Sequence, residues 1–589
     1  MPVLETSAEC RIRIDNKEIK HDISSVQLDQ FVDDHHVLKV RLRQIGKAAR
    51  DKDFDDPGPF TAFLGKAIAV TITPYGGVVD PAKNLEFIGL VTEVSLDNSI
   101  DGLNTVLVAA HSPTITLDGA KQNALYHQQS ASDIIDAIVR NYPITVGSIE
   151  STSGALKYSV QYRETDYQYI MRLASTSGMF AFYDGREFNL AKAGSSDSEE
   201  LVWRESLGVF LMGLGTGIEK INSQAYDYSK KEVYESETTG ALRTSLSTMS
   251  KVSHDASKEM YSNASFVRGL KSGSQGDLDQ TLELIRESSV GKIVTCDGQS
   301  IIPAVSVGNC VKIKGMDKLD GLFWVKSVRH MFDESGKYHN TFTCTPLDMA
   351  FPERKFTRTP FTDLQNGLVV DTDDPEKLGR VKVKFLWNTK DGSMAQPEIW
   401  VRVLTPHAGE KKGFFCLPEV DDEVLIGFEQ GNPSWPLVLG SLYNGKDIPP
   451  TEGHPISWKG GDNNLKLFRT KSGNEIYFCD DSGSEAIVIV QKDNKNSITL
   501  TLDGPKIVIE SEGDISLTGA NISLESSTGD ITLKSAAGIK VESSQDTELK
   551  AGGNLKSEGG MNYDIKAGMN ATLEGGAIVT VKGTLVKIN

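Results

Sequence analysis

The sequence between residues 531 and 586 is a run of octads: ITLKSAAG (531–538), IKVESSQD (539–546), TELKAGGN (547–554), LKSEGGMN (555–562), YDIKAGMN (563–570), ATLEGGAI (571–578) and VTVKGTLV (579–586). Most octads carry apolar residues at the first position, the third position or both, with one polar residue between them. Two apolar residues spaced in this way lie on one face of a short strand. Glycine recurs at the sixth position, where it permits the positive φ of a sharp corner, as Gly552, Gly560, Gly568 and Gly576.

Such short strands bury too little surface to be stable alone. Stacking many of them, with their apolar pairs directed toward one axis, would bury a continuous thin core. Two small apolar side chains per strand suit three identical chains wound about that axis. The octads therefore predict a homotrimeric, triple-stranded β-helix needle over residues 481–589, on the order of 65 Å long at ~4.8 Å per strand. Its predicted core residues are Ile531, Leu533, Ile539, Val541, Leu549, Leu555, Ile565, Leu573, Val579 and Val581.

Two other structures compete for this C-terminal region. After Phe478 the only aromatic residue is Tyr563, and no arginine follows Arg469, which is a composition that disordered tails share. A disordered tail would not keep an eight-residue register of Ile, Leu and Val, however. A β-solenoid formed by a single chain would keep that register, and it stays open as the stronger alternative.

Residues 359–450 differ in pattern, and residues 451–480 connect them to the needle. Alternation of apolar and charged residues predicts short strands at 381–385, 400–403, 423–428 and 437–439, separated by Gly and Pro. About five short strands in some 90 residues are typical of a small closed barrel of the OB type. OB barrels often bind oligonucleotides, but no strand face here combines basic and aromatic residues. We therefore expect an OB-fold barrel without a nucleic-acid partner.

The N-terminal region, residues 1–358, combines strands and helices. Strands are predicted at 37–42, 67–72, 87–94, 311–313, 323–328 and 340–344. Capped helices are predicted at 132–139 and from Thr165 to Leu173, the second ended by Gly178, and a further helix at 277–288. The fold class expected for the whole chain is mainly β with an α+β N-terminal region.

The composition restricts the classes of function. Lys and Arg number 62, Asp and Glu number 80, and the formal net charge is −18, which disfavours binding to nucleic-acid phosphates. No run of 18 apolar residues occurs, and residues 1–6 show no basic segment followed by an apolar one. We therefore expect no membrane-spanning helix and no signal peptide. If the protein leaves the cell, something other than a cleaved signal peptide must export it.

Motifs of enzymes and metal sites are mostly missing. Residues 440–446 match the first seven places of a P-loop, but Asp447 stands where Ser or Thr would bind magnesium. The acidic stretch 371–376 lacks the ligand spacing of a calcium loop, so it predicts a solvated turn. The six cysteines form no C-x-x-C pair and are expected to be reduced, small apolar residues. We therefore expect no catalytic, cofactor or metal site.

Several blocks of the sequence resemble one protein family. The segment Gln161-Tyr-Arg-Glu-Thr-Asp-Tyr-Gln-Tyr-Ile-Met-Arg-Leu173, followed by Gly178, is similar to the QYRE(S/T)D…RL…G block of VgrG-type spike proteins. These proteins belong to type VI secretion and related contractile injection systems. The segments 379–383, 400–403, 413–418 and 423–426 resemble the OB block of that family. Residues 470–483 resemble the entry to its needle.

The resemblance implies a homotrimeric spike with a phage tail hub-like region at 1–358. The implied partners are a PAAR-repeat protein at the needle tip, an Hcp-like inner tube, baseplate proteins and effectors, with transient contact with a target membrane. The tip that would bind the cap comprises Leu585, Val586, Ile588 and Asn589. Residues 373–380 also resemble spikes of extracellular phage-tail-like particles, so that system, a phage baseplate and a spike with hydrolase activity remain alternatives. An adhesin-like fibre would be expected to have a receptor-binding head at its far end.

Overall fold

The computed structural model describes residues 4–19, 22–43, 61–75, 79–98, 104–194, 198–238, 246–263, 265–267, 270, 272–354, 363–386, 398–451, 454 and 463–588. The chain divides into two compact units, Met1–Pro449 and Pro450–Asn589. Within the described residues, no helix has both the length and the apolar character needed to cross a membrane.

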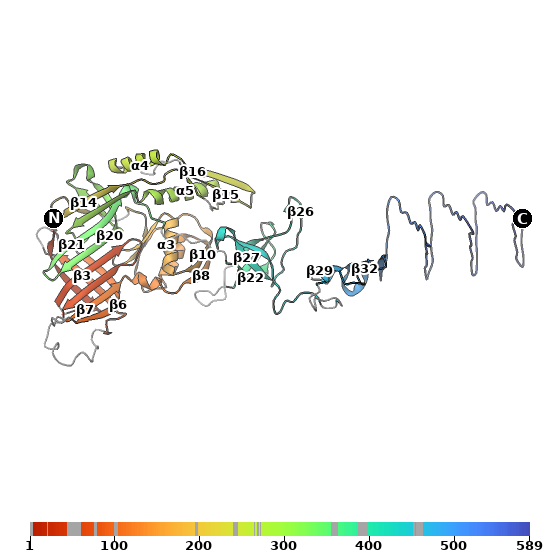
Figure 1. Ribbon diagram of the computed structural model, residues 1–589, viewed down its shortest axis with the longest axis horizontal. Coiled ribbons are helices and arrows are strands. Elements are labelled where there is room, and N and C mark those ends of the chain that lie inside the picture. The colour runs from red at the N-terminus through yellow and green to blue at the C-terminus, as the bar shows by residue number, and fades with distance from the viewer. Residues whose placement is uncertain are drawn as a thin grey trace. The chain divides into compact units, whose positions relative to one another are not determined.

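The first unit is organised around one large sheet (Figure 1). Its thirteen strands follow the order β13-β19-β20-β3-β4-β7-β6-β5-β1-β21-β18-β14, with β2 paired to β1. An additional pairing of β20 with β21 closes the path from β3 to β1 into a ring. The strands are β1 (Thr6–Ile14), β2 (Lys17–Glu18), β3 (Asp22–Phe31), β4 (Val37–Arg43), β5 (Ala67–Pro74), β6 (Leu85–Asn98), β7 (Asn104–His111), β13 (Ser198–Val202), β14 (Leu207–Leu214), β18 (Val294–Ser300), β19 (Cys310–Lys314), β20 (Gly321–Asp333) and β21 (Lys337–Pro346).

Alternation along these strands explains the core of the ring. On β4, Leu38, Val40 and Leu42 are buried, whereas Lys39 and Arg41 between them are exposed. Side chains of successive residues point to opposite faces of a strand, so this pattern gives the sheet one apolar face and one hydrated face. Leu28 and Phe87 complete the same cluster from β3 and β6.

Four helices and three small sheets complete the larger part of this unit, among the described residues. The helices are α2 (Ala131–Val139), α3 (Asp166–Thr176), α4 (Thr248–Met260) and α5 (Gln275–Val290). The sheets pair β8 (Gln122–Gln129) with β10 (Leu156–Glu164), β12 (Phe188–Ala191) with β9 (Val146–Ile149) and β11 (Phe180–Tyr183), and β15 (Ile221–Asp227) with β16 (Glu232–Glu237) and β17 (Ser265–Phe266). Short 3-10 turns lie at Pro113–Leu117, Asp317–Leu319, Leu347–Met349 and Glu429–Gly431.

Helix α3 begins where the sequence predicted it. Thr165 accepts a hydrogen bond from the backbone N–H of Gln168, and the Gln168 side chain accepts one from the Thr165 backbone, which forms a capping box. Gly178, two residues after the helix, has φ +71°, a conformation that favours glycine. The buried face of α3 includes Tyr169 and Ile170.

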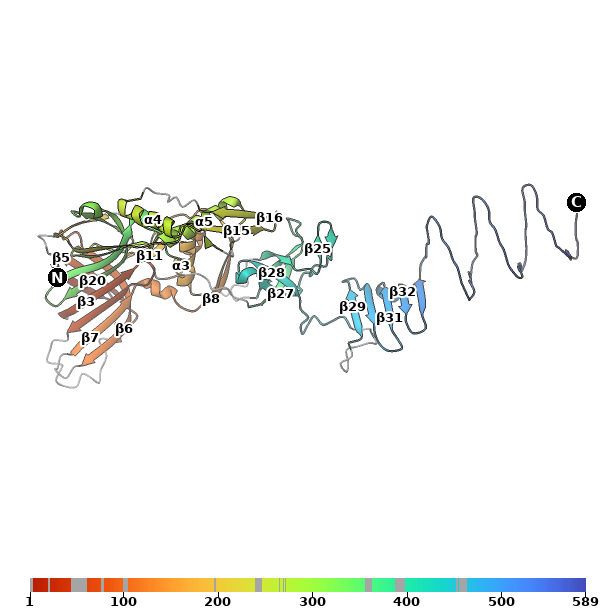
Figure 2. The same ribbon diagram turned by 45° about the horizontal axis from the view of Figure 1, so that its top comes forward.

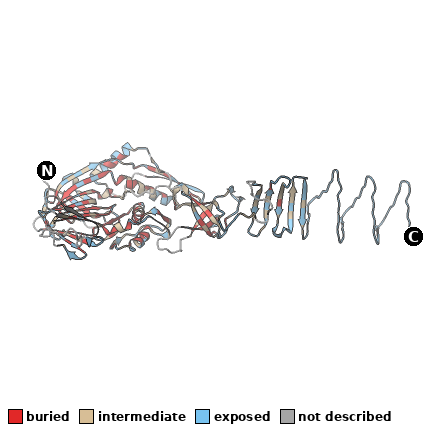
Figure 3. Ribbon diagram, turned by 60° about the horizontal axis from the view of Figure 1, so that its bottom comes forward, coloured by how far each residue is buried: buried red, intermediate tan, exposed pale blue. Residues whose placement is uncertain are grey.

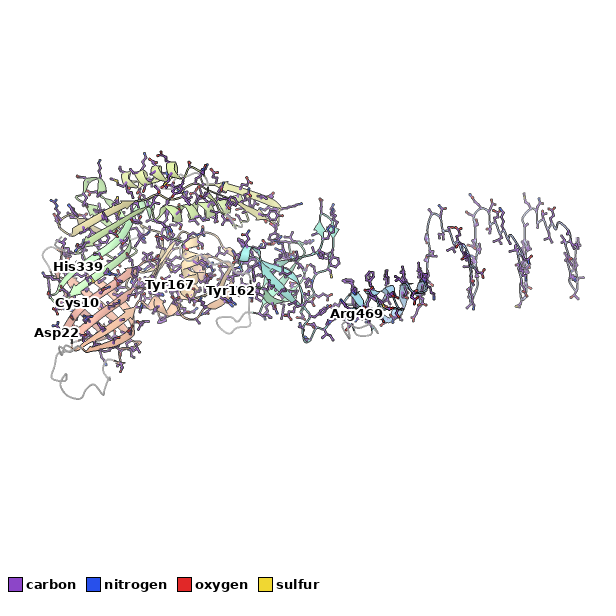
Figure 4. The ribbon with its side chains drawn as sticks, in the orientation of Figure 1. Cys10, Asp22, Tyr162, Tyr167, His339 and Arg469 are labelled. Atoms are coloured by element: carbon purple, nitrogen blue, oxygen red, sulfur yellow. The ribbon has the colours of Figure 1, made fainter. Side chains whose placement is uncertain are left out.

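A five-stranded closed barrel forms the rest of the first unit, and it confirms the predicted OB-type barrel. Its order is β22-β23-β24-β28-β27, with β22 (Gln365–Asp371), β23 (Arg380–Phe385), β24 (Ile399–Val403), β27 (Glu423–Phe428) and β28 (Pro436–Ser441). Its core also includes Leu125, Val160 and Tyr162 from β8 and β10. Tyr162 (Figure 4) accepts a 3.1 Å hydrogen bond from the Gln365 amide, which ties β10 to the start of the barrel.

The second unit contains one antiparallel sheet, seen nearly face-on in Figure 2. Its strands follow chain order: β29 (Leu465–Arg469), β30 (Glu475–Cys479), β31 (Ala486–Val490), β32 (Asn496–Thr501) and β33 (Lys506–Ser511). Gly473, with φ +91°, and Gly483, with φ +80°, lie in the turns that join the first three strands. Residues 512–588 continue as extended segments and bends without assigned strands.

Candidate functional site

The sheet of the second unit has one uncovered apolar face. Its register places Phe468 opposite Ile476, then Ile489, Ile498 and Ile509, so that one apolar side chain from each strand forms a row. These five side chains are 39–56% exposed. A second row on the same face contains Phe478, Ile487, Leu500 and Ile507. Contiguous apolar surface of this size marks an interaction site.

A groove runs along this face. It has a volume of about 550 Å³, and its lining includes the row from Phe468 to Ile509 and continues to Ile515, beyond the last strand. The apolar surface of the sheet is therefore continuous with the first apolar residue of the following segment.

The opposite face of the sheet is covered at one corner by the chain's own residues. Arg469 (Figure 4) donates hydrogen bonds to Glu475, and a Glu475 carboxylate oxygen lies 3.0 Å from His454 Nε2. The His454 ring packs edge-on against Tyr477, with centroids 4.9 Å apart. Arg469, Glu475 and Tyr477 alternate along the strands with Phe468 and Ile476, so they occupy the other face. Most described side chains on this opposite face are buried or half-buried, whereas the row from Phe468 to Ile509 is exposed.

The octads expose all of their predicted core residues. Every residue from 512 to 588 is exposed, as the colouring in Figure 3 shows, and the ten predicted core side chains are 48–77% exposed. A single-chain solenoid would bury these residues against its own next turn. The described octads do not do so, because no strand pairs with another beyond Ser511.

The four glycines predicted as needle corners lie at bends of the chain, but their backbone does not have the positive φ that was expected. Bends occur at Gly552, Gly560, Gly568 and Gly576, yet none of the four has a positive φ. In the single chain these glycines therefore do not use left-handed backbone, and their role as corners of the needle stays a prediction. A Cβ at any of them would meet nothing within 4 Å in this chain, so any steric need for glycine must come from outside it.

At the predicted tip, Leu585, Val586 and Ile588 are 48–91% exposed. Asn589 lies outside the described residues. The sequence analysis singled out the octads but not the face formed by Phe468 to Ile509. Its signal was a series of short runs rich in β-branched residues, AIVIV in β31 and KIVIES in β33, with Ile498 and Leu500 alternating with Ser and Thr in β32.

The acidic stretch 371–376 is largely an exposed turn, as predicted, but one of its carboxylates, Asp374, is buried. Asp374 is 7% exposed and accepts hydrogen bonds from the Arg380 guanidinium, the closest 2.6 Å long, and from the backbone N–H groups of Glu376, Leu378 and Arg380. Burial alone would raise the pKa of Asp374, but these hydrogen bonds outweigh it and lower the pKa to about 2. The carboxylate therefore acts as an anchor for the loop.

Two histidines lie in the core of the first unit. Burial lowers the pKa of both His36 and His330 to about 3, so both are neutral at pH 7. His330 Nδ1 lies 2.7 Å from the Tyr338 hydroxyl, and its Nε2 lies 3.2 Å from Gln30 Oε1. These contacts join β20, β21 and β3, which is a structural role. In the described part of the chain, no three His, Cys, Asp or Glu residues are grouped to hold a metal ion.

The cysteines are free thiols. Five are buried or half-buried, as expected of small apolar residues, and Cys296 lies opposite Cys344 on neighbouring strands. Cys416 is exposed, so the expectation fails for this residue.

Comparisons with known proteins agree with this architecture. The sequence model of the phage tail baseplate hub family (GPD) matches residues 38–336, and that of the type VI secretion system/phage-baseplate injector OB domain matches residues 365–443. The first match spans just over half of the chain, and the second coincides with the closed barrel. The chain therefore belongs to the phage tail baseplate hub family, whose members are structural parts of injection machines.

Relatives and similar structures point to the same class. The actin cross-linking toxin VgrG1 of Vibrio cholerae O395 is 24% identical over 68% of this chain and 40% of its own length. The type VI secretion system spike protein VgrG3 of Vibrio cholerae N16961 is 25% identical over 63% of this chain and 38% of its own length. This chain thus spans about two fifths of these relatives. A chain of the half-lidded Francisella PdpA–VgrG complex shares the fold, with a TM-score of 0.56 at 11% identity over 87% of this chain and 89% of that one.

Proposed function

We propose that three copies of this chain form the spike of a contractile injection machine of the type VI, VgrG-like kind. The observation that carries the proposal is the uncovered apolar face of β29–β33, continued by octads whose apolar residues are all exposed in a single chain. Three such faces directed at one axis would bury these residues together. A thin core of this kind would make the needle stiff along its axis.

The activity proposed is mechanical. Contraction of a sheath would drive an inner tube, and the trimeric needle would concentrate that force on a small area of the target membrane. The proposed partners are an Hcp-like inner tube and baseplate proteins at the hub, a PAAR-repeat cap at residues 585–589, and effectors carried by the spike. The protein would wait in the cytoplasm and leave through the apparatus. The proposal includes no catalytic step, cofactor or nucleic acid.

Light scattering coupled to size-exclusion chromatography of the full chain tests this assignment. A mass of three chains is expected, and electron micrographs should show a thin rod attached to a wider head. A folded monomer at micromolar concentration would contradict the proposal, because the octads would then be exposed in solution.

The tip assignment has its own test. Deleting residues 579–589 should leave the trimer intact, since most of the octads remain, and should abolish capture of a PAAR-repeat protein in a pull-down. Undiminished capture would reject the tip. Turnover of peptidoglycan by the purified trimer would instead favour the alternative of a spike with hydrolase activity.

A further inference from the structure

Three segments that follow strands of the barrel leave it at the same end. The end of β22 pairs with the start of β23, and the end of β24 lies beside β28 in parallel. Asp371, Arg380, Val403, Glu423 and Ser441 therefore lie at one end, here called the arm end. The loop 372–379, the segment 404–422 and residues 442–449 all leave the barrel there.

The arm end gathers exposed apolar side chains. Of the described barrel residues, Leu364 and Leu386 are the exposed large apolar ones toward the other end. The arm end carries many more, and the following six are 48–81% exposed: Leu404, Phe414, Phe415, Val420, Tyr443 and Ile448. Large aromatic side chains left this exposed on a small barrel indicate a surface that another protein covers.

A hairpin projects from this end. It pairs β25 (Ala408–Gly409) with β26 (Lys412–Gly413), and residues 405–414 are here called the arm. The Phe414 N–H donates to the His407 carbonyl at 2.9 Å, and the Thr405 hydroxyl donates to the Phe414 carbonyl at 2.7 Å. Gly413 has φ +142°, and a Cβ there would lie 2.5 Å from the His407 oxygen. The arm is therefore a built hairpin whose shape depends on a glycine.

The charges of the arm and of the barrel are complementary. Lys411 and Lys412 are exposed at the arm tip, and neither forms an ion pair with any residue that the structure describes. Asp373 and Asp421 are exposed at the arm end of the barrel and are likewise without an ion pair among the described residues. Within one copy, these two lysines and two aspartates thus form no ion pair with one another, and the tip, which also carries Glu410, keeps an excess of one positive charge.

We propose that the arm of each copy lies across the arm end of the next copy in the trimer. Phe414 and Phe415 would cover apolar surface of the neighbouring barrel, and Lys411 and Lys412 would face its Asp373 and Asp421. Each chain carries both the arm and the barrel surface that an arm would contact. In a threefold ring every arm therefore has a neighbouring barrel to contact. This inference rests on the proposed homotrimer and adds where its barrels meet.

Cross-linking of the full-length protein tests the contact. The variant Lys412→Cys/Asp421→Cys, in a Cys416→Ser background, would be treated with a short bismaleimide and resolved on denaturing gels. Covalent dimers and trimers are expected. The matched variant Lys17→Cys/Asp421→Cys, whose first cysteine lies on β2, should remain monomeric on the gel.

The exposed thiol of Cys416 provides a second measurement, since it adjoins Phe415 and the other five cysteines are buried or half-buried. Alkylation of Cys416 should be at least tenfold faster in Lys411→Glu/Lys412→Glu than in the unaltered protein. Adding Asp373→Lys and Asp421→Lys should restore the slow rate. The control Lys17→Glu/Lys318→Glu has the same change in net charge and should alkylate at the unaltered rate.

Different results would contradict the arm contact and the homotrimer. A trimer by light scattering that gives no cross-link between chains, or a Cys416 that reacts equally fast in all variants, would overturn the arm contact alone. A monomer by light scattering would overturn the trimer and the arm contact together. Protection of Cys416 only when a different protein is added would assign the arm end to that protein and contradict a second copy as its occupant.

Discussion

Arg380 and Asp374 form an ion pair of 2.6 Å whose two side chains are only 2% and 4% exposed. The pair lies at the arm end of the barrel, where Arg380 also contacts Glu376 at 3.1 Å. Asp374 in turn fixes three backbone N–H groups of the loop 374–380. A carboxylate that binds both a guanidinium and the backbone of its own loop determines the shape of that loop, so removing it should affect the whole end of the barrel.

We expect Asp374→Asn to destabilise the barrel by about 3–5 kcal/mol, because it removes the buried partner of Arg380 and leaves only the exposed Glu376 as counter-charge. Hydrogen exchange of the amides in β22–β28 would measure the loss as a lower free energy of local opening. Asp15→Asn is the control, since Asp15 is exposed in the turn between β1 and β2 and forms no ion pair with a described residue. It should change that free energy by less than ~0.5 kcal/mol. Equal exchange in the two variants would contradict the role given to Asp374.

The same carboxylate gives a pH dependence. The pKa of Asp374 is about 2 in the folded protein, below the ~3.9 of an unfolded aspartate. A group whose pKa is lowered by folding stabilises the fold above its unfolded pKa, and this stabilisation is lost as the pH falls through the folded value. Protection of the barrel amides should therefore decline between about pH 4 and pH 2, and Asp374→Asn should remove that part of the decline. A profile identical in the variant would refute the assignment.

Local signals in the sequence predicted local structure well. Thr165 predicted the start of α3, and the alternation of Val381, Val383 and Phe385 with lysines predicted β23. Both signals act between residues close in the chain. The OB-type barrel followed from the number and spacing of such strands, which is also a local property.

The features that were missed depend on distant contacts or on polar packing. Helix α4 buries Ser250, Ser253, His254 and Ser257, so it has no apolar stripe that periodicity could detect. The burial of Asp374 depends on Arg380 folding back across a loop that composition alone describes as acidic. In the single chain the octads expose their apolar residues, so its own fold places none of them in a core. The proposed trimer would supply the remaining contacts.

Glycine at position 308 should be essential for packing in the first unit. It has φ +78°, and a Cβ there would lie 1.9 Å from the Phe182 ring. We expect Gly308→Ala to cost more than ~3 kcal/mol, because it combines backbone strain with overpacking of the core. Gly154→Ala is the control: it has the same φ of +78° with nothing within 4 Å, and should cost only about 1 kcal/mol. Thermal unfolding of both variants would show whether the difference is present.

Substitutions within the octads distinguish two possibilities: apolar residues buried in a trimeric core, or apolar residues exposed in a tail. In one chain Val541 and Ile565 are 74% and 72% exposed, so Val541→Asp and Ile565→Asp would be harmless in a monomer. At a threefold axis each would bury three carboxylates, at a cost of several kcal/mol per assembly. We expect both to shift the trimer toward smaller species on dilution, measured by light scattering. Lys550→Asp, at a residue whose neighbour Glu548 also faces solvent, should leave the mass unchanged. Equal masses for all three variants at every concentration would show that these apolar residues form no shared core.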